Sequence, residues 1–413
     1  MSTAGSSFIS TKESETSSTS TAYYTSSSDM RLIKAYTFTG AMSSVLMFNM
    51  LLNAAVPFET VIWEGVTLSV WLNACFMMAV FITAVVCVAS PMLSTKKCIP
   101  HVANAVSIAG AVLIALVAQL FPSTDAPQWV IVVLPAFAAV MGIGSGLQQT
   151  HMFNICALWP EDMIILASSS GGFGGIYSFA VFTILSNIFS KSLSSQQSLV
   201  WAQFAFGMVV PLLNSAIWFM LAPREVTSRS LAKLTDEQVN VMEEGEVLVA
   251  TKKWHELLKA NSLSLFNAVF VLIVSFSLFP GVVPLSFGYS YTWTSVFIGL
   301  WQVLDTVFRY IPAFGWFPKL NRTFWLLLVL VRVVLFIPLF VVPMRGNMLP
   351  EWAMVIGFVL FVATNSVTAT VMNHDFIVRV DTPADIKLTA GLLIAGCNGG
   401  VFLGSLIANL YTL

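Results

Sequence analysis

Long apolar stretches recur along this chain of 413 residues, and they limit the folds that it can adopt. About 20 apolar residues in a helix are enough to cross the hydrocarbon core of a bilayer. Only 9% of the residues are charged, against about 25% in soluble domains. The sequence therefore predicts an all-α integral membrane protein with eleven transmembrane helices, near residues 33–57, 67–90, 102–121, 129–157, 163–189, 199–222, 262–288, 291–315, 323–343, 352–374 and 386–413.

Lysine and arginine predict the orientation, because cytoplasmic loops carry an excess of both residues. If the N-terminus is cytoplasmic, fifteen of them fall in inside segments, and only Lys191 and Arg345 fall in outside loops. Two more, Arg309 and Arg332, lie within predicted spans. We therefore expect a cytoplasmic N-terminus and a C-terminus outside. The plasma membrane is the expected location, with an internal membrane as the alternative.

Two hydrophilic segments predict the domain organisation. Residues 1–30 contain 17 serines or threonines, which is typical of a disordered cytoplasmic tail. Residues 223–259 carry 13 of the 39 charged residues and are expected to form a solvated cytoplasmic linker. Amphipathic helices within 230–242 and 251–258 are the alternative for that linker. The linker separates a six-helix bundle, residues 31–222, from a five-helix bundle, residues 260–413, as in two-lobed carriers.

Asp305 is the one acidic residue well inside a predicted span, and Arg309 follows it by four positions. Residues at this spacing share one face of a helix. A charge at the bilayer centre costs about 2.5–3.5 kcal/mol on insertion scales, so such residues usually face a cavity or a partner. The two residues are candidates for a functional site, and a purely structural ion pair is the alternative.

Uncharged polar side chains also occur inside spans of both predicted bundles. Each is costly to bury without a hydrogen-bond partner, although any one could simply bond another helix. Together they indicate a polar interior suited to a neutral solute with hydroxyls and ring nitrogens, and Phe48 and Trp301 are possible aromatic walls. The polar residues are Asn49, Gln148, Gln149, His151, Gln302, Asn365 and Asn373.

Glycines and prolines mark places where helices approach closely or break. Glycines four residues apart, as at Gly171 and Gly175, let helix backbones pack closely in lipid. The same spacing joins Gly142 to Gly146 and Gly400 to Gly404. The segment 279–284 contains two prolines and should interrupt its span. It could form a gate or hinge at the outer end, or only a kink.

Several functional classes find no support in the sequence. The five cysteines are scattered, without a CxxC motif or a Cys/His cluster, so neither a disulfide framework nor a metal site is expected. No catalytic carboxylate pair or GxSxG motif lies inside the spans, and no phosphate-binding loop is present. We expect no enzyme activity, no cofactor and no binding of nucleic acid.

In these residues the chain resembles the equilibrative nucleoside transporter family. The resemblance is strongest at Asp305 and Arg309, with Gln302 one turn earlier. It continues at the junction of the fourth and fifth spans, where Gln149 precedes the glycine-rich run 171–175. Further matching positions are Pro160, Phe279, Pro280, Arg332, Pro338 and Asn365.

The chain departs from the family pattern at two positions. Phe48 precedes Asn49 where the family usually has tryptophan, and Ser170 stands where a glycine is expected. The first departure bears on the aromatic contact with the substrate that the family pattern implies. The second bears on fine preferences for substrate or inhibitor.

The resemblance implies a fold related to the major facilitator type, with substrate at the midplane between two bundles. The resemblance implies that Gln149 would bond the edge of the nucleoside base. It also implies that Asp305 and Arg309 would contact polar groups of the nucleoside, including the ribose hydroxyls. Phe48 would stack, and Asn49 and Gln302 would support or line the site. Further candidate positions are His151, Trp301, Asn365 and Arg332, the last more for helix packing on the cytoplasmic side. Gly171, Gly172 and Gly175 would serve helix packing.

The resulting hypothesis is a facilitative carrier of nucleosides, most of all purine nucleosides, and of nucleobases in addition. One alternative is a proton-coupled version in which Asp305 or His151 titrates. The other is a membrane receptor that binds without transport. The expected partners are the nucleoside or nucleobase substrate and the lipid bilayer, and the expected oligomeric state is a monomer.

Overall fold

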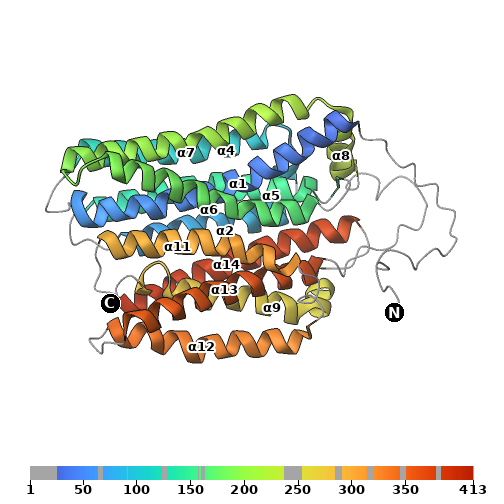
Figure 1. The fold of residues 1–413 in the computed structure, drawn as a ribbon. Helices are drawn as coiled ribbons and strands as arrows, with labels where there is room; N and C mark the ends of the chain where they lie inside the picture. Colours follow the sequence, from blue (N-terminus) through green and yellow to red (C-terminus); the bar gives the residue numbers. More distant parts are fainter. Residues whose placement is uncertain are drawn as a thin grey trace, which may run out of the picture.

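The computed structural model describes residues 26–63, 68–90, 92–122, 128–156, 158–159, 163–236, 254–283, 291–313, 320–344, 350–377 and 383–412. The predicted tail up to residue 25, the linker residues 237–253 and positions such as Pro160 and Pro284 lie outside these ranges. All regular elements within them are helices. The helices run roughly along one direction and form two groups, which lie above and below each other in Figure 1.

The first group, the N-terminal lobe, is built from six long helices. It also contains the short helix α3 (Met92–Thr95), the π-helical turn η1 (Phe58–Ile62) and helix α8 (Glu225–Asp236). The long helices are α1 (Ser27–Pro57), α2 (Ser69–Ala89), α4 (Ile99–Leu120), α5 (Val130–Cys156), α6 (Met163–Ile188) and α7 (Leu193–Leu221).

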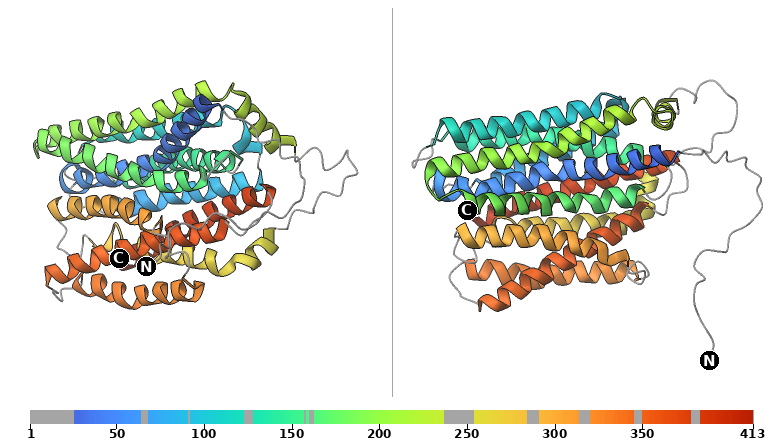
Figure 2. Two further views of the ribbon diagram at one scale, coloured as in Figure 1. Left: turned by 45° about the vertical axis from the view of Figure 1, so that its right-hand side comes forward. Right: turned by 45° about the horizontal axis from the view of Figure 1, so that its top comes forward.

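The second group, the C-terminal lobe, is built from five long helices. They are α9 (Trp254–Leu278), α11 (Tyr291–Tyr310), α12 (Arg322–Met344), α13 (Glu351–Ile377) and α14 (Pro383–Thr412). A short 3-10 turn, η2 (Ile311–Ala313), extends α11. The lobes meet where α6 packs on α11 and α2 packs on α14, and the two views in Figure 2 show the same division.

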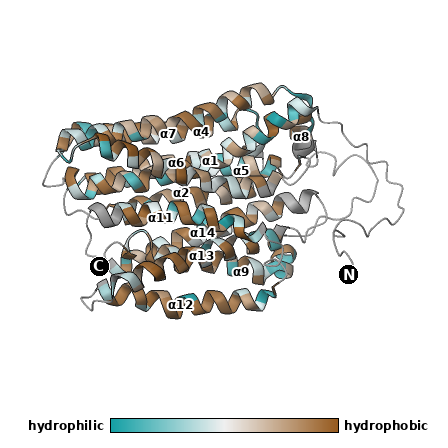
Figure 3. Ribbon diagram, in the orientation of Figure 1, coloured by the Kyte–Doolittle hydropathy of each residue, from teal (hydrophilic) through white to brown (hydrophobic). Residues whose placement is uncertain are grey.

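Ten helices in the described parts of the chain are long and apolar enough to cross a membrane. The predicted span near 291–315 is not one of these ten and corresponds to α11, which lies among them in the bundle and carries Gln302, Asp305 and Arg309. An eleven-span topology therefore stays a prediction. The ribbon of the outer helix α12 is coloured mostly as hydrophobic in Figure 3, as expected for a helix that crosses a bilayer.

The ends of α1 and α14 agree with an odd number of crossings. Helix α1 begins at the same end of the bundle as α8, and α14 ends at the opposite end (Figure 1). We call the end that carries α8 the α8 end, and it corresponds to the predicted cytoplasmic side. Helix α1 begins earlier than predicted, because the hydroxyl of Ser26 accepts a hydrogen bond of 3.1 Å from the Asp29 N–H. Residues 27–30 are therefore helical and do not belong to a disordered tail.

Residues 225–236 of the predicted linker are helical, as the amphipathic-helix alternative expected for part of this segment. They form α8, whose Thr227 and Leu231 are buried against the N-terminal lobe. An ion pair of 3.7 Å between Arg224 and Asp29 holds the start of this segment to α1. An amphipathic pattern was visible in the sequence, and contact with apolar side chains at the lobe surface favours the helix.

The proline-containing segment after α9 ends that helix inside the molecule. Helix α9 stops at Leu278, directly before Phe279 and Pro280, and the predicted span to residue 288 is not one continuous helix. A proline removes a backbone donor and blocks helical continuation. Phe279, Val282 and Val283 are fully buried, so this turn packs within the protein.

Candidate functional site

A cavity of about 200 Å³ lies between the two lobes. The N-terminal lobe lines it with residues of α1, α2, α5 and α6, and the C-terminal lobe with residues of α9, α11, α13 and α14. The polar residues in its wall are Ser44, Asn49, Gln149, Ser168, Gln302, Asp305, Arg309, Asn365, Asn373 and Asn398. The cavity therefore brings together most of the polar positions that the sequence singled out from separate spans.

An ion pair on α11 forms one side of this cavity. The Arg309 Nε donates to Asp305 Oδ2 at 2.8 Å, and the Ser366 hydroxyl of α13 donates to Asp305 Oδ1 at 2.6 Å. The Arg309 side chain is 27% exposed and the Asp305 side chain 14%, so the pair borders the cavity and is not fully buried in the core. Among the described residues, the terminal nitrogens of Arg309 have no hydrogen-bond partner. They are available to a ligand oxygen.

Two carboxamides meet across the cavity. Gln149 comes from α5 in the N-terminal lobe, and Asn398 comes from α14 in the C-terminal lobe. The Asn398 Nδ2 donates to Gln149 Oε1 at 3.0 Å. Both side chains are partly exposed to the cavity that they line.

A second interlobe amide contact closes one end of the cavity. The Gln302 Nε2 donates to Asn49 Oδ1 at 3.1 Å, and its Oε1 accepts from Asn53 Nδ2 at 3.5 Å. The Asn53 Nδ2 also donates to the Ser178 hydroxyl at 2.7 Å. Because Gln302 uses both its oxygen and its nitrogen and is only 2% exposed, it joins the lobes more than it faces the cavity.

The cavity extends from this contact toward the α8 end. On α1 its wall runs from Asn49 back to Ala41, which is about 12 Å at 1.5 Å per residue. On the antiparallel helix α11 it runs from Gln302 forward to Arg309, in the same direction. In this conformation the cavity is therefore bounded by the Asn49–Gln302 contact on the side away from α8.

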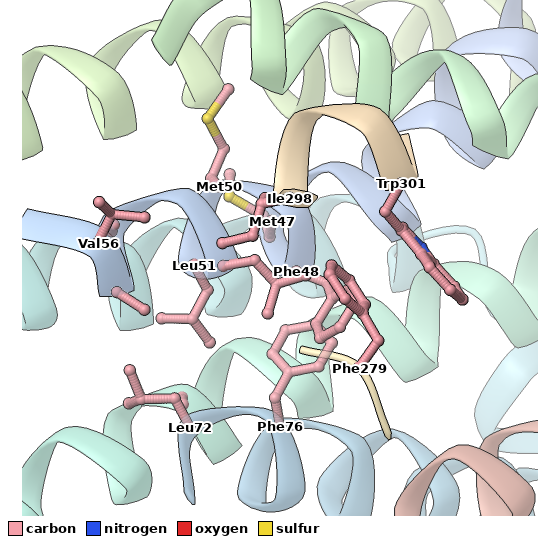
Figure 4. Close-up of a cluster of buried hydrophobic side chains, with 14 of the residues drawn as sticks. Met47, Phe48, Met50, Leu51, Val56, Leu72, Phe76, Phe279, Ile298 and Trp301 are labelled. Atoms are coloured by element: carbon pink, nitrogen blue, oxygen red, sulfur yellow. The ribbon is translucent and has the colours of Figure 1, made fainter. Parts of the chain in front are cut away.

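Aromatic rings pack beside that contact and form the apolar wall. Trp301 stacks on Phe279, with ring centroids 4.6 Å apart and an interplanar angle of 10°. Phe48 lies 5.4 Å from Phe76 and 6.4 Å from Phe276, centroid to centroid. Figure 4 shows Phe48, Phe76, Phe279 and Trp301 gathered at the junction of the lobes. Phe48 and Trp301 line the cavity as predicted wall positions, and a stacking role stays a prediction.

Glycines allow α6 to reach α11 beside the ion pair. A Cβ at Gly172 would lie 3.0–3.1 Å from Thr306, and a Cβ at Gly175 would lie 3.1 Å from the Gln302 Cβ. The Thr306 hydroxyl donates to the Gly172 carbonyl at 2.7 Å. Gly171 instead faces α1, where an added Cβ would meet Val45 at 3.4 Å.

Two candidate positions lie outside the cavity wall. His151 is 1% exposed, its Nδ1 bonds the Ser94 carbonyl oxygen at 2.6 Å, and its ring packs edge-on against the rings of Tyr36 and Trp218. Gln148, one residue before Gln149, bonds Asn214 at 3.0 Å within the N-terminal lobe. Helical neighbours point in different directions, so only Gln149 reaches the cavity.

Arg332 also lies away from the cavity, midway along α12 and not at its predicted cytoplasmic end. It is 1% exposed and donates to the Phe361 carbonyl at 2.7 Å and to the Ser275 hydroxyl at 2.6 Å. Ser275 in turn bonds Asn365 Oδ1 at 2.7 Å. Arg332 therefore positions the cavity residue Asn365 through one intermediate side chain.

Sequence reasoning missed three residues of this arrangement. Asn398 and Asn53 each form a hydrogen bond between the lobes, and Ser366 bonds Asp305 within the C-terminal lobe. The criterion that selected Asn49 and Asn365, a polar side chain inside a predicted span, also applies to Asn53 and Asn398. Ser366 carried no such signal, because serine hydroxyls commonly bond their own helix backbone.

Comparison with solved structures defines the class of fold. The chain aligns with the crystal structure of a D-xylose–proton symporter at 12% identity, covering 91% of this chain and 89% of that one, with a TM-score of 0.63. It aligns with the inward-open xylose transporter XylE from E. coli at 13% identity, covering 91% and 88%, with a TM-score of 0.60. The chain also aligns with FucP, a major facilitator superfamily transporter in the outward conformation, at 12% identity. This alignment covers 92% of this chain and 95% of that one, with a TM-score of 0.51. The chain therefore has the major facilitator fold, as the resemblance implied.

Sequence comparison gives a more specific relationship. No protein-family model matches the chain. The chain is 28% identical over 214 residues to Nucleoside transporter 1 of Plasmodium vivax (strain Salvador I). The match covers 49% of this chain and 49% of that protein, so it spans about half the length of the relative. This distant homology to a nucleoside transporter confirms the resemblance noted from the motifs.

Proposed function

We propose that this protein is a facilitative transporter of nucleosides, chiefly purine nucleosides, that also accepts nucleobases. The observation that carries the proposal is the polar cavity between the lobes, because both lobes contribute side chains to it. The distant homology to a Plasmodium nucleoside transporter supports the substrate class and a transporter rather than an enzyme. The location proposed for it is the plasma membrane.

The cavity chemistry divides between two parts of a nucleoside. The terminal nitrogens of Arg309 and the carboxylate of Asp305 suit ribose hydroxyls, which both donate and accept hydrogen bonds. The carboxamide of Gln149 suits the hydrogen-bonding edge of a base. Phe48 and Trp301 supply the apolar faces that a planar base packs against.

Transport follows from movement of the lobes about this cavity. The Asn49–Gln302 contact and the aromatic wall close the side away from α8, and the cavity extends toward α8. With eleven spans and a cytoplasmic N-terminus, this conformation is closed on the outer side. Opening the outer side requires separation of α1 from α11, and closing the inner side then completes alternating access.

The two alternatives have less support. In the proton-coupled version, Asp305 would exchange a proton, yet its two oxygens accept bonds from Arg309 and Ser366. His151, the other candidate, is buried against the rings of Tyr36 and Trp218, away from the cavity. A receptor that binds without transport would not require a cavity shared by two lobes with the major facilitator fold.

Uptake into proteoliposomes tests the proposal. Purified wild type should move labelled inosine and adenosine down a gradient with saturation, and an imposed pH gradient should leave the rate unchanged. Asp305→Ala and Arg309→Ala should both abolish saturable uptake while retaining a folded peak in size-exclusion chromatography. If folded wild type moves no nucleoside, the proposed function is wrong. Acceleration by a proton gradient would favour the proton-coupled alternative.

A further inference from the structure

We propose that Asn398 is a second contact for the base, placed opposite Gln149, so that one carboxamide from each lobe binds a single donor–acceptor edge. This inference rests on the proposed function and identifies the chemistry that the site selects. Asn398 lies on the last helix, α14, and is not one of the positions that carry the motif resemblance.

The geometry leaves two hydrogen-bonding atoms unused. The Asn398 Nδ2 donates to Gln149 Oε1 at 3.0 Å. Within the parts of the chain that the structure describes, Gln149 Nε2 and Asn398 Oδ1 have no protein partner. Both residues line the cavity, so one donor and one acceptor are available there side by side.

An adjacent donor and acceptor match one edge of a heterocyclic base. A ring amide, as in hypoxanthine, offers an N–H to Asn398 Oδ1 and a carbonyl oxygen to Gln149 Nε2. In adenine the exocyclic amine and the neighbouring ring nitrogen offer the same pair of functions. Rotation of both carboxamides exchanges their roles and preserves one donor and one acceptor, so either edge is accommodated.

The other interlobe amide contact at the cavity does not offer this arrangement. Gln302 bonds Asn49 through its nitrogen and Asn53 through its oxygen, and it is buried. The Asp305–Arg309 pair is charged and suits hydroxyl groups. The Gln149–Asn398 pair is thus the part of the cavity whose free atoms are neutral, adjacent and drawn from both lobes.

The placement has a consequence for transport. A base that bonds both free atoms contacts α5 and α14 together and links the two lobes. Such a link stabilises conformations in which α5 and α14 are close. Asn398 therefore contributes to selection of the base and to the response of the lobes to binding.

The test compares two nucleosides that differ at this edge. Inosine carries the ring N–H, whereas 1-methylinosine replaces it with a methyl group. The KM of labelled inosine, and the inhibition constant of 1-methylinosine against it, are measured in proteoliposomes for wild type, Asn398→Ala and the control Asn187→Ala. Asn187 is exposed near the end of α6 and bonds its own helix at Thr183, so this control removes an asparagine far from the cavity.

Loss of one neutral hydrogen bond weakens binding by roughly 3–10-fold. We expect Asn398→Ala to raise the inosine KM by that factor and to leave the inhibition constant of 1-methylinosine nearly unchanged. Discrimination between the two nucleosides then falls by the same factor, and the control keeps the wild-type ratio. If Asn398→Ala does not fold, Asn398→Ser also lacks the carboxamide and should show the same loss of discrimination.

Three outcomes contradict the inference or its basis. If folded Asn398→Ala and Asn398→Ser discriminate between inosine and 1-methylinosine as strongly as wild type does, Asn398 does not contact the base. An equal loss for both nucleosides assigns Asn398 to packing alone. Absence of nucleoside uptake by folded wild type overturns the proposed function, and this inference with it, and is therefore distinct from the first two results.

Discussion

A single methyl group at Gly172 should impair transport, because at this glycine α6 packs closely against α11. The change Gly172→Ala places a Cβ 3.0 Å from Thr306 Oγ1, 3.1 Å from its Cγ2 and 3.1 Å from its Cα. Favourable carbon–carbon contacts lie at about 3.5–4.0 Å. The side-chain atoms of Thr306 can rotate away, but its Cα can move only with the helix, so α6 and α11 must separate by about 0.5 Å.

The cost of this separation falls on one conformation. Overpacking of a close contact costs about 1–3 kcal/mol. In Gly172→Ala the separation would also lengthen the hydrogen bond of 2.7 Å from the Thr306 hydroxyl to the carbonyl of residue 172. Since α6 and α11 belong to different lobes, each lobe can keep its own packing. A penalty of this size shifts the balance between conformations with and without the contact by roughly 5–150-fold.

The assay is the initial rate of nucleoside uptake into proteoliposomes, together with thermal unfolding in detergent. Gly172→Ala should lower the maximal rate at least several-fold. Gly171→Ala is the matched control, because its Cβ would meet only Val45 Cγ2 at an ordinary 3.4 Å, together with a more distant backbone oxygen. Adding Thr306→Ser, which removes Cγ2 and keeps the hydroxyl, should restore part of the rate. Equal rates for Gly172→Ala and Gly171→Ala would refute the steric reasoning.

Three further predictions concern the charged and reactive groups. Asp305→Ala and Arg309→Ala should be non-additive in thermal unfolding, with a coupling of about 0.5–3 kcal/mol, and strict additivity would show that the pair does not stabilise the fold. In a variant whose other four cysteines are serine, a saturating nucleoside should slow thiol labelling of the cavity residue Cys397. An unchanged labelling rate would place the substrate elsewhere. Arg332→Met should lower stability by about 1–3 kcal/mol through lost hydrogen bonds, measured by thermal unfolding. Arg332→Met should retain saturable inosine uptake, which Arg309→Ala loses, and loss of uptake by folded Arg332→Met would contradict its place outside the cavity.

The sequence alone predicted the class of protein and the placement of most helices. Span length and the scarcity of charge depend on local composition, and the bilayer imposes both. The Asp305–Arg309 contact was predictable for the same reason, since residues four apart on one helix meet wherever that helix packs. The helix end before Pro280 follows from the chemistry of a single residue.

Tertiary structure decided which of the remaining polar residues form the site. Gln148 and Gln149 are neighbours in sequence, yet one bonds Asn214 within a lobe and the other faces the cavity. Asn398, 249 positions from Gln149, became a candidate only through their hydrogen bond. Rotation of a helix about its axis and the partner that it meets depend on packing between distant segments. Local sequence determines which side chains are costly to bury, and only the packed lobes determine which of them share one cavity.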